Sequence, residues 1–252
     1  MNSRLTFAAA LGALLLPLPV LAQEEEPDPA VFATYFYCNE AREARADTII
    51  SESVAPIMDR HMAAGHLTAW GWYAHNTGGR WRRLLYMVSP DIPTVMSARE
   101  AVIDDLISEA AEATAELTAV CPSHDDYVWE VGAGSDPTLA QGRSAVTMAT
   151  YMVCDFTEEG RADDIVEEVF AAIYNKHVEA GNITGWGWLE HNIGGKYRRI
   201  ATIAATDMSS LISARAAIFE DLFEEAPLAL NTFGEICGSH SDYIWEVRIA
   251  KP

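Results

Sequence analysis

The chain contains one stretch of sequence twice. Residues 31–131 align with residues 147–247 without a gap, at an offset of 116 positions, and 43 of the 101 aligned pairs are identical. Agreement over this length indicates a duplication, so the fold must be one that two similar halves can share. We assign residues 23–132 to repeat 1 and residues 146–252 to repeat 2. A linker at 133–145, rich in glycine, serine and proline, joins them.

Each repeat shows the same succession of hydrophobic periodicities. Gly65 follows a helical pattern as its terminating residue, and Thr77-Gly78-Gly79 is typical of a hairpin in which glycine supplies positive φ. The first copy predicts a strand, a helix, two strands, a helical region and a strand at 33–38, 45–64, 67–76, 80–89, 91–120 and 127–131. The order is β-α-β-β-α-β, and the predicted fold class is α+β.

This order is that of the ferredoxin-like unit, in which an antiparallel four-stranded sheet carries both helices on one face. The other face is bare, and a tandem copy can cover it by packing sheet to sheet within one chain. In element order, in the hairpin and in the start of the second helix, the chain resembles the dimeric α+β barrel superfamily in a fused form. The resemblance implies two tandem βαββαβ repeats that form a pseudo-dimeric α+β barrel, an arrangement with which a monomer is consistent.

Four cysteines recur at equivalent positions in the two copies, and an even number of cysteines in an exported chain favours disulfides. Three pairings are possible from the sequence alone. In the resembled topology the first strand ends beside the start of the fourth, which implies Cys38–Cys121 and Cys154–Cys237. A pairing between the copies is the alternative.

The N-terminus is typical of a secretory signal peptide. One basic residue, Arg4, precedes an apolar run from Leu5 to Val20, and small residues suited to cleavage end at Ala22. We therefore predict that residues 1–22 are removed and that the protein is exported, to a periplasm or outside the cell, with a retained anchor as the alternative. No later apolar run is long enough to cross a bilayer. A formal charge of −20 opposes binding to nucleic acid or to anionic membranes.

Alternation along the second strand places Trp70 and Trp72 on one face. On the opposite face, the equivalent strand of repeat 2 carries small and aliphatic residues, as expected beneath packed helices. We therefore predict that the tryptophans point to the bare face. Cross-strand parity adds Trp81, Arg83, Leu85 and Met87, and the same face is expected for Tyr35, Tyr37, Tyr127 and Trp129. The ligand-binding candidates are the tryptophans, the hairpin histidines and the strand arginines, namely Trp70, Trp72, His75, Arg83, Trp186, Trp188, His191 and Arg199.

Two interpretations of this face compete. The aromatic rings either fill a solid core, with Arg83 and Arg199 over rings or paired with Glu130, Glu190 or Glu246, or they line a cavity. In a cavity the arginines would meet the anionic group of a planar ligand, such as a haem propionate or a carboxylate. The expected partner is thus a small aromatic or anionic ligand.

No zinc spacing, phosphate-binding glycine loop, nucleophile elbow or dinucleotide fingerprint occurs in the sequence, and no cofactor or catalytic residue is identified. The histidines that recur between the copies have structural explanations at a helix end, at the hairpin and before the last strand, namely His61, His177, His75, His191, His124 and His240. We therefore predict a non-enzymatic binding or interaction module. The alternatives are a haem-degrading or cofactor-free monooxygenase of the resembled superfamily and a purely structural protein.

Overall fold

The computed structural model describes residues 28–135 and 144–252. The strands of repeat 1 are β1 (Ala30–Tyr37), β2 (Ala69–Gly78), β3 (Arg83–Ser89) and β4 (Ser123–Gly134). Its helices are η1 (Glu40–Arg42), α1 (Glu43–Ile49), η2 (Ile50–Val54), α2 (Ala55–Ala63), α3 (Ile92–Glu109) and α4 (Ala111–Val120).

Repeat 2 has the same strands and α-helices in the same order, without a counterpart of η1 in its described residues. Its strands are β5 (Val146–Val153), β6 (Gly185–Ile193), β7 (Arg199–Ala205) and β8 (Ser239–Lys251). Its helices are α5 (Glu159–Ile165), η4 (Val166–Phe170), α6 (Ala171–Glu179), α7 (Met208–Glu225) and α8 (Pro227–Ile236). The β-α-β-β-α-β order is therefore present in both copies.

The predicted helices differ from the observed ones in two respects. The first helix, predicted at 45–64, contains a π-helical segment at Ile50–Val54. The second helical region is two helices, because the backbone leaves the helical conformation at Ala110 (φ −132°, ψ 32°) and at Ala226 (φ −134°, ψ 43°). In repeat 2 the break precedes Pro227, and a proline disfavours helical geometry in the residue before it. The predicted glycine positions are correct, since Gly65 and Gly78 adopt positive φ angles of 77° and 120°.

Asp91 and Asp207 set the start of α3 and α7. The backbone N–H of Thr94 donates to Asp91 Oδ1 at 2.7 Å, and that of Ser210 donates to Asp207 Oδ1 at 2.9 Å. Each aspartate satisfies an N–H group that has no partner within the helix. The second helical region of each repeat therefore begins at a residue that the sequence marks plainly.

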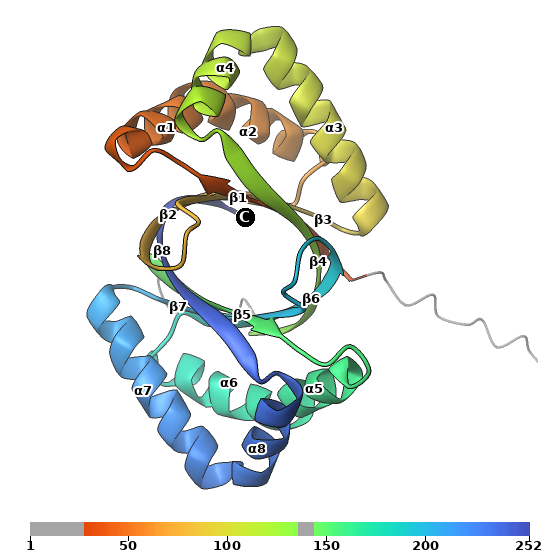
Figure 1. Cartoon of the computed structure of the whole chain (residues 1–252), viewed down its shortest axis with the longest axis vertical. Helices are drawn as coiled ribbons and strands as arrows, with labels where there is room; N and C mark the ends of the chain where they lie inside the picture. Colours follow the sequence, from red (N-terminus) through yellow and green to blue (C-terminus); the bar gives the residue numbers. More distant parts are fainter. Residues whose placement is uncertain (1–27, 136–143) are drawn as a thin grey trace, which may run out of the picture.

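The eight strands form one closed barrel in the order β1-β3-β2-β8-β5-β7-β6-β4. β2 pairs with β8 and β4 pairs with β6, so the edge strands of one repeat are hydrogen-bonded to those of the other. Figure 1 shows this barrel end-on, with α1–α4 on one side and α5–α8 on the opposite side. The predicted pseudo-dimeric α+β barrel is confirmed, and strand pairing between the repeats covers the sheet edges that would otherwise be open.

The disulfides are Cys38–Cys121 and Cys154–Cys237, each spanning 83 residues. The predicted pairing is confirmed, and the pairing between copies is wrong. Each bridge joins the end of the first strand of a repeat to the approach to its fourth strand. Two disulfides are typical of proteins from oxidising compartments.

The described residues begin five positions into the predicted repeat 1, and two further predicted segments fall wholly or partly outside them. The predicted signal peptide, 1–22, is one of them. The predicted linker at 133–145 is the other: β4 continues to Gly134, β5 begins at Val146, and the central part of the linker is not described. Within the two described ranges, no helix combines the length and the apolar character that a membrane span requires.

Buried apolar side chains form three clusters. Two lie between the sheet and the helices, one in each repeat, and the third fills part of the barrel interior. The interior is thus a separate environment, bounded by strands from both repeats, and the site is described from there.

Candidate functional site

The tryptophans of β2 and β6 lie on the helix-covered face of the sheet. Trp70 and Trp72 are fully buried there, and their indole Nε1 atoms donate to Asp59 Oδ1 at 3.0 Å and to Asp47 Oδ1 at 2.7 Å. In repeat 2, Trp186 and Trp188 make the equivalent hydrogen bonds to Asn175 and Asp163. The prediction that these four tryptophans point to the bare face is therefore wrong.

Gly71 explains the error. It faces the barrel interior, where a Cβ on this residue would lie 2.5 Å from Cε1 of Tyr86. Gly71 makes room for the Tyr86 ring from the neighbouring strand. The prediction had instead attributed the small residues on this face of the strand to packed helices. The predicted parity is correct, since Trp70 pairs with Met87 and Trp72 with Leu85. The prediction is therefore also wrong for Arg83, Leu85 and Met87, which lie on the helix-covered face with the tryptophans.

The aromatic side chains of the first and fourth strands face the barrel interior, as predicted. Tyr35, Tyr127 and Trp129 belong to the interior cluster, together with their counterparts Tyr151, Tyr243 and Trp245. Trp81, in the loop before β3, also enters the barrel. The interior is therefore aromatic, as expected, although different strands supply many of its rings.

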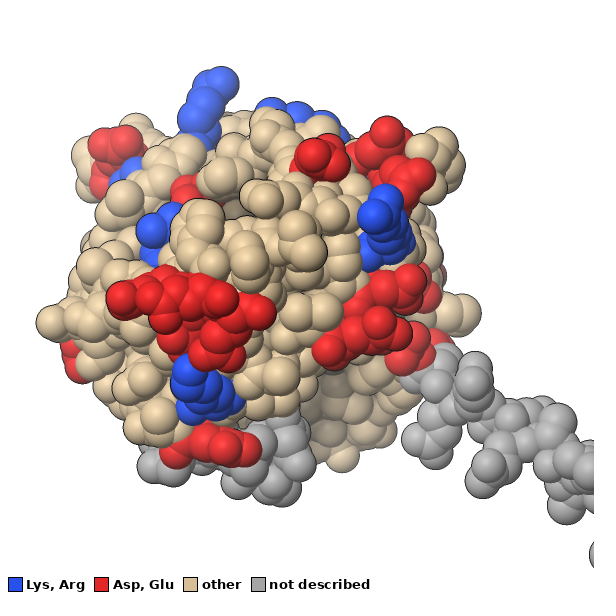
Figure 2. Space-filling model, turned by 90° about the horizontal axis from the view of Figure 1, so that it is seen from below, with Lys and Arg blue, Asp and Glu red and all other residues tan. Residues whose placement is uncertain are grey.

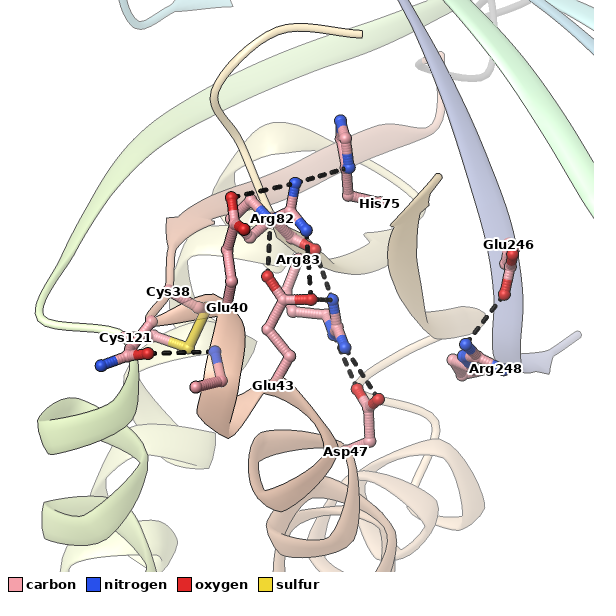
Figure 3. A network of polar contacts seen from close by, with 12 residues as sticks. Cys38, Glu40, Glu43, Asp47, His75, Arg82, Arg83, Cys121, Glu246 and Arg248 are labelled. Atoms are coloured by element: carbon pink, nitrogen blue, oxygen red, sulfur yellow. Dashed lines mark hydrogen bonds and ion pairs between the residues drawn. A yellow bond between two sulfur atoms is a disulfide. The ribbon is translucent and has the colours of Figure 1, made fainter. Parts of the chain in front are cut away.

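Arg83 lies on the helix side in a closed polar network (Figure 3). It donates two hydrogen bonds to the Asp47 carboxylate, at 2.7 and 2.9 Å, and one to Glu43 at 3.0 Å, while its side chain is 4% exposed. Arg82 also pairs with Glu43 and donates to Nδ1 of His75 at 2.9 Å. Repeat 2 reproduces the network with Arg198, Arg199, Glu159, Asp163 and His191.

The charges in this network compensate one another. Burial acts to raise the pKa of Glu43, but Arg82 and Arg83 outweigh it and the pKa is lowered. Burial and then Arg82 lower the pKa of His75. Its Nδ1 accepts from Arg82, which places the proton of the neutral ring on Nε2, a buried atom without a hydrogen-bond partner. Because both arginines already bind carboxylates, the network is a structural one and offers no free cation to an anionic ligand.

The other recurring histidines also have local partners. His61 and His177 are buried at helix ends and contact Asp105 at 3.1 Å and Asp221 at 3.0 Å through Nε2. His124 lies at the barrel rim, 3.5 Å from Asp126. In the part of the chain that the structure describes, no cluster of three or more potential ligands could hold a metal ion.

The hairpin end of the barrel is filled by stacked rings. Trp81 stacks on Tyr35 at 4.2 Å between centroids and on Tyr243 at 5.0 Å. Its Nε1 donates to Asp125 at 2.8 Å. Burial and the Asp125 carboxylate raise the pKa of Tyr37, at the same rim, to about 12. We call this ring assembly the aromatic plug.

Beyond the aromatic plug the interior is hollow. A cavity of about 320 Å³ lies between the strands, within the size range of small-molecule sites. Its wall is mainly aliphatic and aromatic. The polar groups are hydroxyls and indole N–H groups from Tyr35, Tyr73, Tyr86, Trp129, Ser135, Thr147, Tyr151, Thr202 and Trp245. Among the described lining residues there is no carboxylate, imidazole, amine or guanidinium.

The cavity differs between the repeats. Tyr73 and Tyr86 project from repeat 1, with their hydroxyl oxygens 3.4 Å apart, whereas Leu189 and Thr202 occupy the equivalent positions of repeat 2. A Cβ on Gly187 would lie 3.0 Å from Thr202 Oγ1, so no ring covers this glycine. The smaller side chains of β7 leave the space that Tyr86 fills on β3.

Two donors in the cavity wall have no acceptor. Nε1 of Trp129 and Nε1 of Trp245 are buried without a hydrogen-bond partner, and both indoles are 0% exposed. Each indole N–H faces one phenolic oxygen, Tyr35 for Trp129 and Tyr151 for Trp245, and lowers the pKa of that phenol without reaching hydrogen-bond geometry, while burial dominates and raises both pKa values. An unsatisfied buried donor costs about 1–3 kcal/mol, so two at equivalent positions need an explanation.

A second space lies between the sheet and the helices of repeat 2. It measures about 100 Å³ and is lined by Met148, Met152 and Ala201, where repeat 1 has Phe32, Phe36 and Leu85. No imidazole lines it among the described residues, and its volume is below the usual range for a ligand of drug size. His75 and His191 are held by arginines elsewhere. These residues do not fit a haem group.

Charged side chains are confined to the outside of the molecule and to the polar networks. Figure 2 shows groups of acidic side chains, with fewer basic ones, on the helix-covered face of repeat 2. The barrel cavity contrasts with this surface because its described wall carries no charge.

The sequence left open whether the aromatic rings fill the barrel or line a cavity, and the structure has a hollow part. Trp129 was expected on the bare face, but its unpartnered N–H group was not, and Thr202 was not singled out. A comparison of side-chain volume between equivalent positions would have identified Tyr86/Thr202 and Leu85/Ala201 as the two large differences on β3 and β7.

Comparisons with known proteins support the fold. No model of a protein family matches the sequence, and no curated protein matches it either. Solved structures do match. One is a candidate monooxygenase from Fusobacterium nucleatum, with a TM-score of 0.61, 12% identity, and coverage of 90% of this chain and 95% of that one.

Two other solved structures show the same arrangement. An anthrone oxidase-like protein gives a TM-score of 0.58 at 11% identity, covering 90% of this chain and 94% of that one. A mutant chlorite dismutase from Candidatus Nitrospira defluvii gives 0.56 at 5% identity, covering 89% and 93%. Together with the closed barrel and its helical layers, these similarities show that the chain has the fold of the dimeric α+β barrel proteins, with both halves in one polypeptide.

Proposed function

We propose that this protein binds a small, uncharged, mainly aromatic ligand inside the barrel. The observation that supports the proposal is the 320 Å³ cavity, with its aliphatic and aromatic wall and a few hydroxyl and indole donors. This composition is typical of ligand sites, in which apolar surface supplies affinity and a small number of polar groups supply orientation.

The lining favours an uncharged ligand. An ionised group in this cavity would lose its hydration without meeting a counter-charge, at a cost of several kcal/mol. Burial already raises the pKa of the wall tyrosines Tyr35, Tyr73 and Tyr86, which shows that the interior disfavours negative charge. The site is also rigid, since the closed barrel and both disulfides hold the strands, and a preformed site loses less entropy on binding.

The test uses the difference between the repeats. Thr202→Tyr places in repeat 2 the residue that repeat 1 carries as Tyr86, and the ring would fill the cavity over Gly187. Ala201→Leu is the matched control. This substitution is at the adjacent position, whose side chain faces the helices. It introduces the residue that repeat 1 carries as Leu85.

Binding would be measured with 1-aminoanthracene, an uncharged fluorescent probe, by titration against the wild type and both variants. Thr202→Tyr should weaken binding at least about tenfold, which corresponds to about 1.4 kcal/mol, and Ala201→Leu should leave it within about twofold. The reverse pattern would place the probe on the helix side and contradict the proposal. Thermal melts of both variants would check that the fold is intact.

A cofactor-free oxygenase is the second candidate. It is supported by the structural neighbours described as a candidate monooxygenase and as anthrone oxidase-like. In such a reaction dioxygen converts a ring methylene into a carbonyl, with water as the second product. The test measures oxygen uptake with anthrone. Uptake that is lost in Thr202→Tyr but kept in Ala201→Leu would favour the oxygenase. Uptake equal to that of buffer would favour binding without catalysis.

A further inference from the structure

Trp129 and Trp245 occupy equivalent positions in the two repeats, and both have the same unsatisfied group. Each indole is fully buried, each lines the cavity, and neither Nε1 has a hydrogen-bond partner. Other buried tryptophans in the chain are satisfied, since Nε1 of Trp70 and Trp188 donates to a carboxylate. The two unpaired donors therefore share one cause, which is their position facing the hollow part of the barrel.

The surroundings of these donors add further donors. The hydroxyls of Tyr35 and Tyr151 lie beside the two indoles and stay protonated, because burial raises their pKa. The centre of the barrel thus brings two indole N–H and two phenol O–H protons to one side of the cavity, against two phenolic oxygens. A group that brings lone pairs without a proton would satisfy this arrangement better than another hydroxyl.

We infer that the ligand carries an uncharged hydrogen-bond acceptor of the carbonyl class, and that the indole N–H groups of Trp129 and Trp245 recognise it. This inference rests on the proposed function. A ketone or quinone oxygen offers two lone pairs and no charge, which suits a wall that has donors but no cation. A pure hydrocarbon of the same shape would leave both N–H groups unpaired, and a site built around hydrogen-bond donors discriminates strongly against such an analogue.

The test compares 9-fluorenone with fluorene, two planar molecules that differ at one position, where a carbonyl replaces a methylene. Both are measured by displacement of 1-aminoanthracene. The wild type should bind fluorenone about tenfold or more tightly than fluorene, since an unmet buried hydrogen bond accounts for a difference of this order. The carbonyl stretching band of bound fluorenone should shift to lower wavenumber.

The double variant Trp129→Phe/Trp245→Phe keeps two aromatic rings and removes both N–H groups. Its fluorenone-to-fluorene affinity ratio should fall to about one, through weaker fluorenone binding, and the carbonyl band should return toward its position in apolar solvent. Trp70→Phe is the matched control, because its indole lies on the helix side, and it should keep the wild-type ratio. Should the double variant fail to fold, the wild-type ratio and band position still decide the question.

The outcomes separate the two proposals. Equal affinities for fluorenone and fluorene in the wild type would overturn the inference and leave the proposed function standing. A ratio that the double variant leaves unchanged would also overturn it, and would indicate that water alone satisfies the indoles. If neither compound displaces the probe and Thr202→Tyr has no effect on probe binding, both proposals are wrong.

Discussion

Strands β3 and β7 occupy equivalent places in the two repeats, yet they differ in volume on both faces. On the barrel face Tyr86 corresponds to Thr202, and on the helix face Leu85 corresponds to Ala201. Repeat 1 is filled at both places, while repeat 2 borders the barrel cavity on one face and a smaller space on the other. The strands have the same backbone pairing and differ only in what their side chains fill.

The polar scaffold, by contrast, is the same in both copies. Arg83 pairs with Asp47 and Glu43, and Arg199 pairs with Asp163 and Glu159. Loss of one partner would leave a buried charge uncompensated, whereas loss of apolar volume only opens space. A duplicated barrel can therefore gain interior space through uncharged substitutions on one strand without disturbing the ion pairs that hold helices to sheet.

The largest expected effect tests the identical part. Arg83→Met and Arg199→Met should each lower the free energy of unfolding by about 3–5 kcal/mol, because Asp47 or Asp163 loses its arginine in a mostly buried site and the neighbouring glutamate keeps one arginine of two. Equilibrium unfolding in guanidinium chloride measures both. Arg248→Met is the control, since this side chain is 49% exposed beside Glu246 and should cost less than about 1 kcal/mol. A large loss in one repeat only would show that the scaffolds are not equivalent.

A smaller effect tests the part that differs. Gly71→Ala should destabilise by about 1–3 kcal/mol, because its Cβ would meet the Tyr86 ring at 2.5 Å. Gly187→Ala should cost less than about 1 kcal/mol, since its nearest neighbour is Thr202 Oγ1 at 3.0 Å. Adding Tyr86→Thr to Gly71→Ala should recover most of the loss, which a double-mutant cycle in urea would measure. Equal losses at the two glycines would contradict the assignment of Tyr86 as the cause.

The smallest effect concerns pH, and it should be equal in the two repeats. Burial and a neighbouring arginine lower the pKa of His75 and of His191 in the folded state. In the unfolded state the imidazole has its ordinary pKa of about 6.5, so near this pH the unfolded state binds more protons than the folded state. Stability should therefore fall as the pH drops below about 6.5, weakly because both side chains are partly exposed.

Urea midpoints between pH 7.5 and 5.5 would follow this loss. His75→Gln and His191→Gln should each reduce the slope by a similar amount, and His240→Gln, exposed at the rim, would be measured alongside. A slope that neither substitution changes would assign the pH dependence to other groups.

Much of the fold could be predicted from local patterns. The repeat, the order of elements, the glycines at Gly65 and Gly78, and the duplicated cysteines all depend on residues near one another in sequence or on the alignment of the copies. The pairing of Cys38 with Cys121 followed once the topology was assumed. The face of β2 could not be derived in the same way, because Gly71 is small on account of Tyr86, a residue on another strand.

Two α+β units of β-α-β-β-α-β order in one chain can be derived from sequence alone, because hydrophobic periodicity and identity between the copies are local properties of the polypeptide. The face of each strand that lines the barrel, and the hollow interior near Thr202, became known from the folded arrangement. A cavity is the volume that side chains from several strands of both repeats leave unfilled, so no single segment contains it.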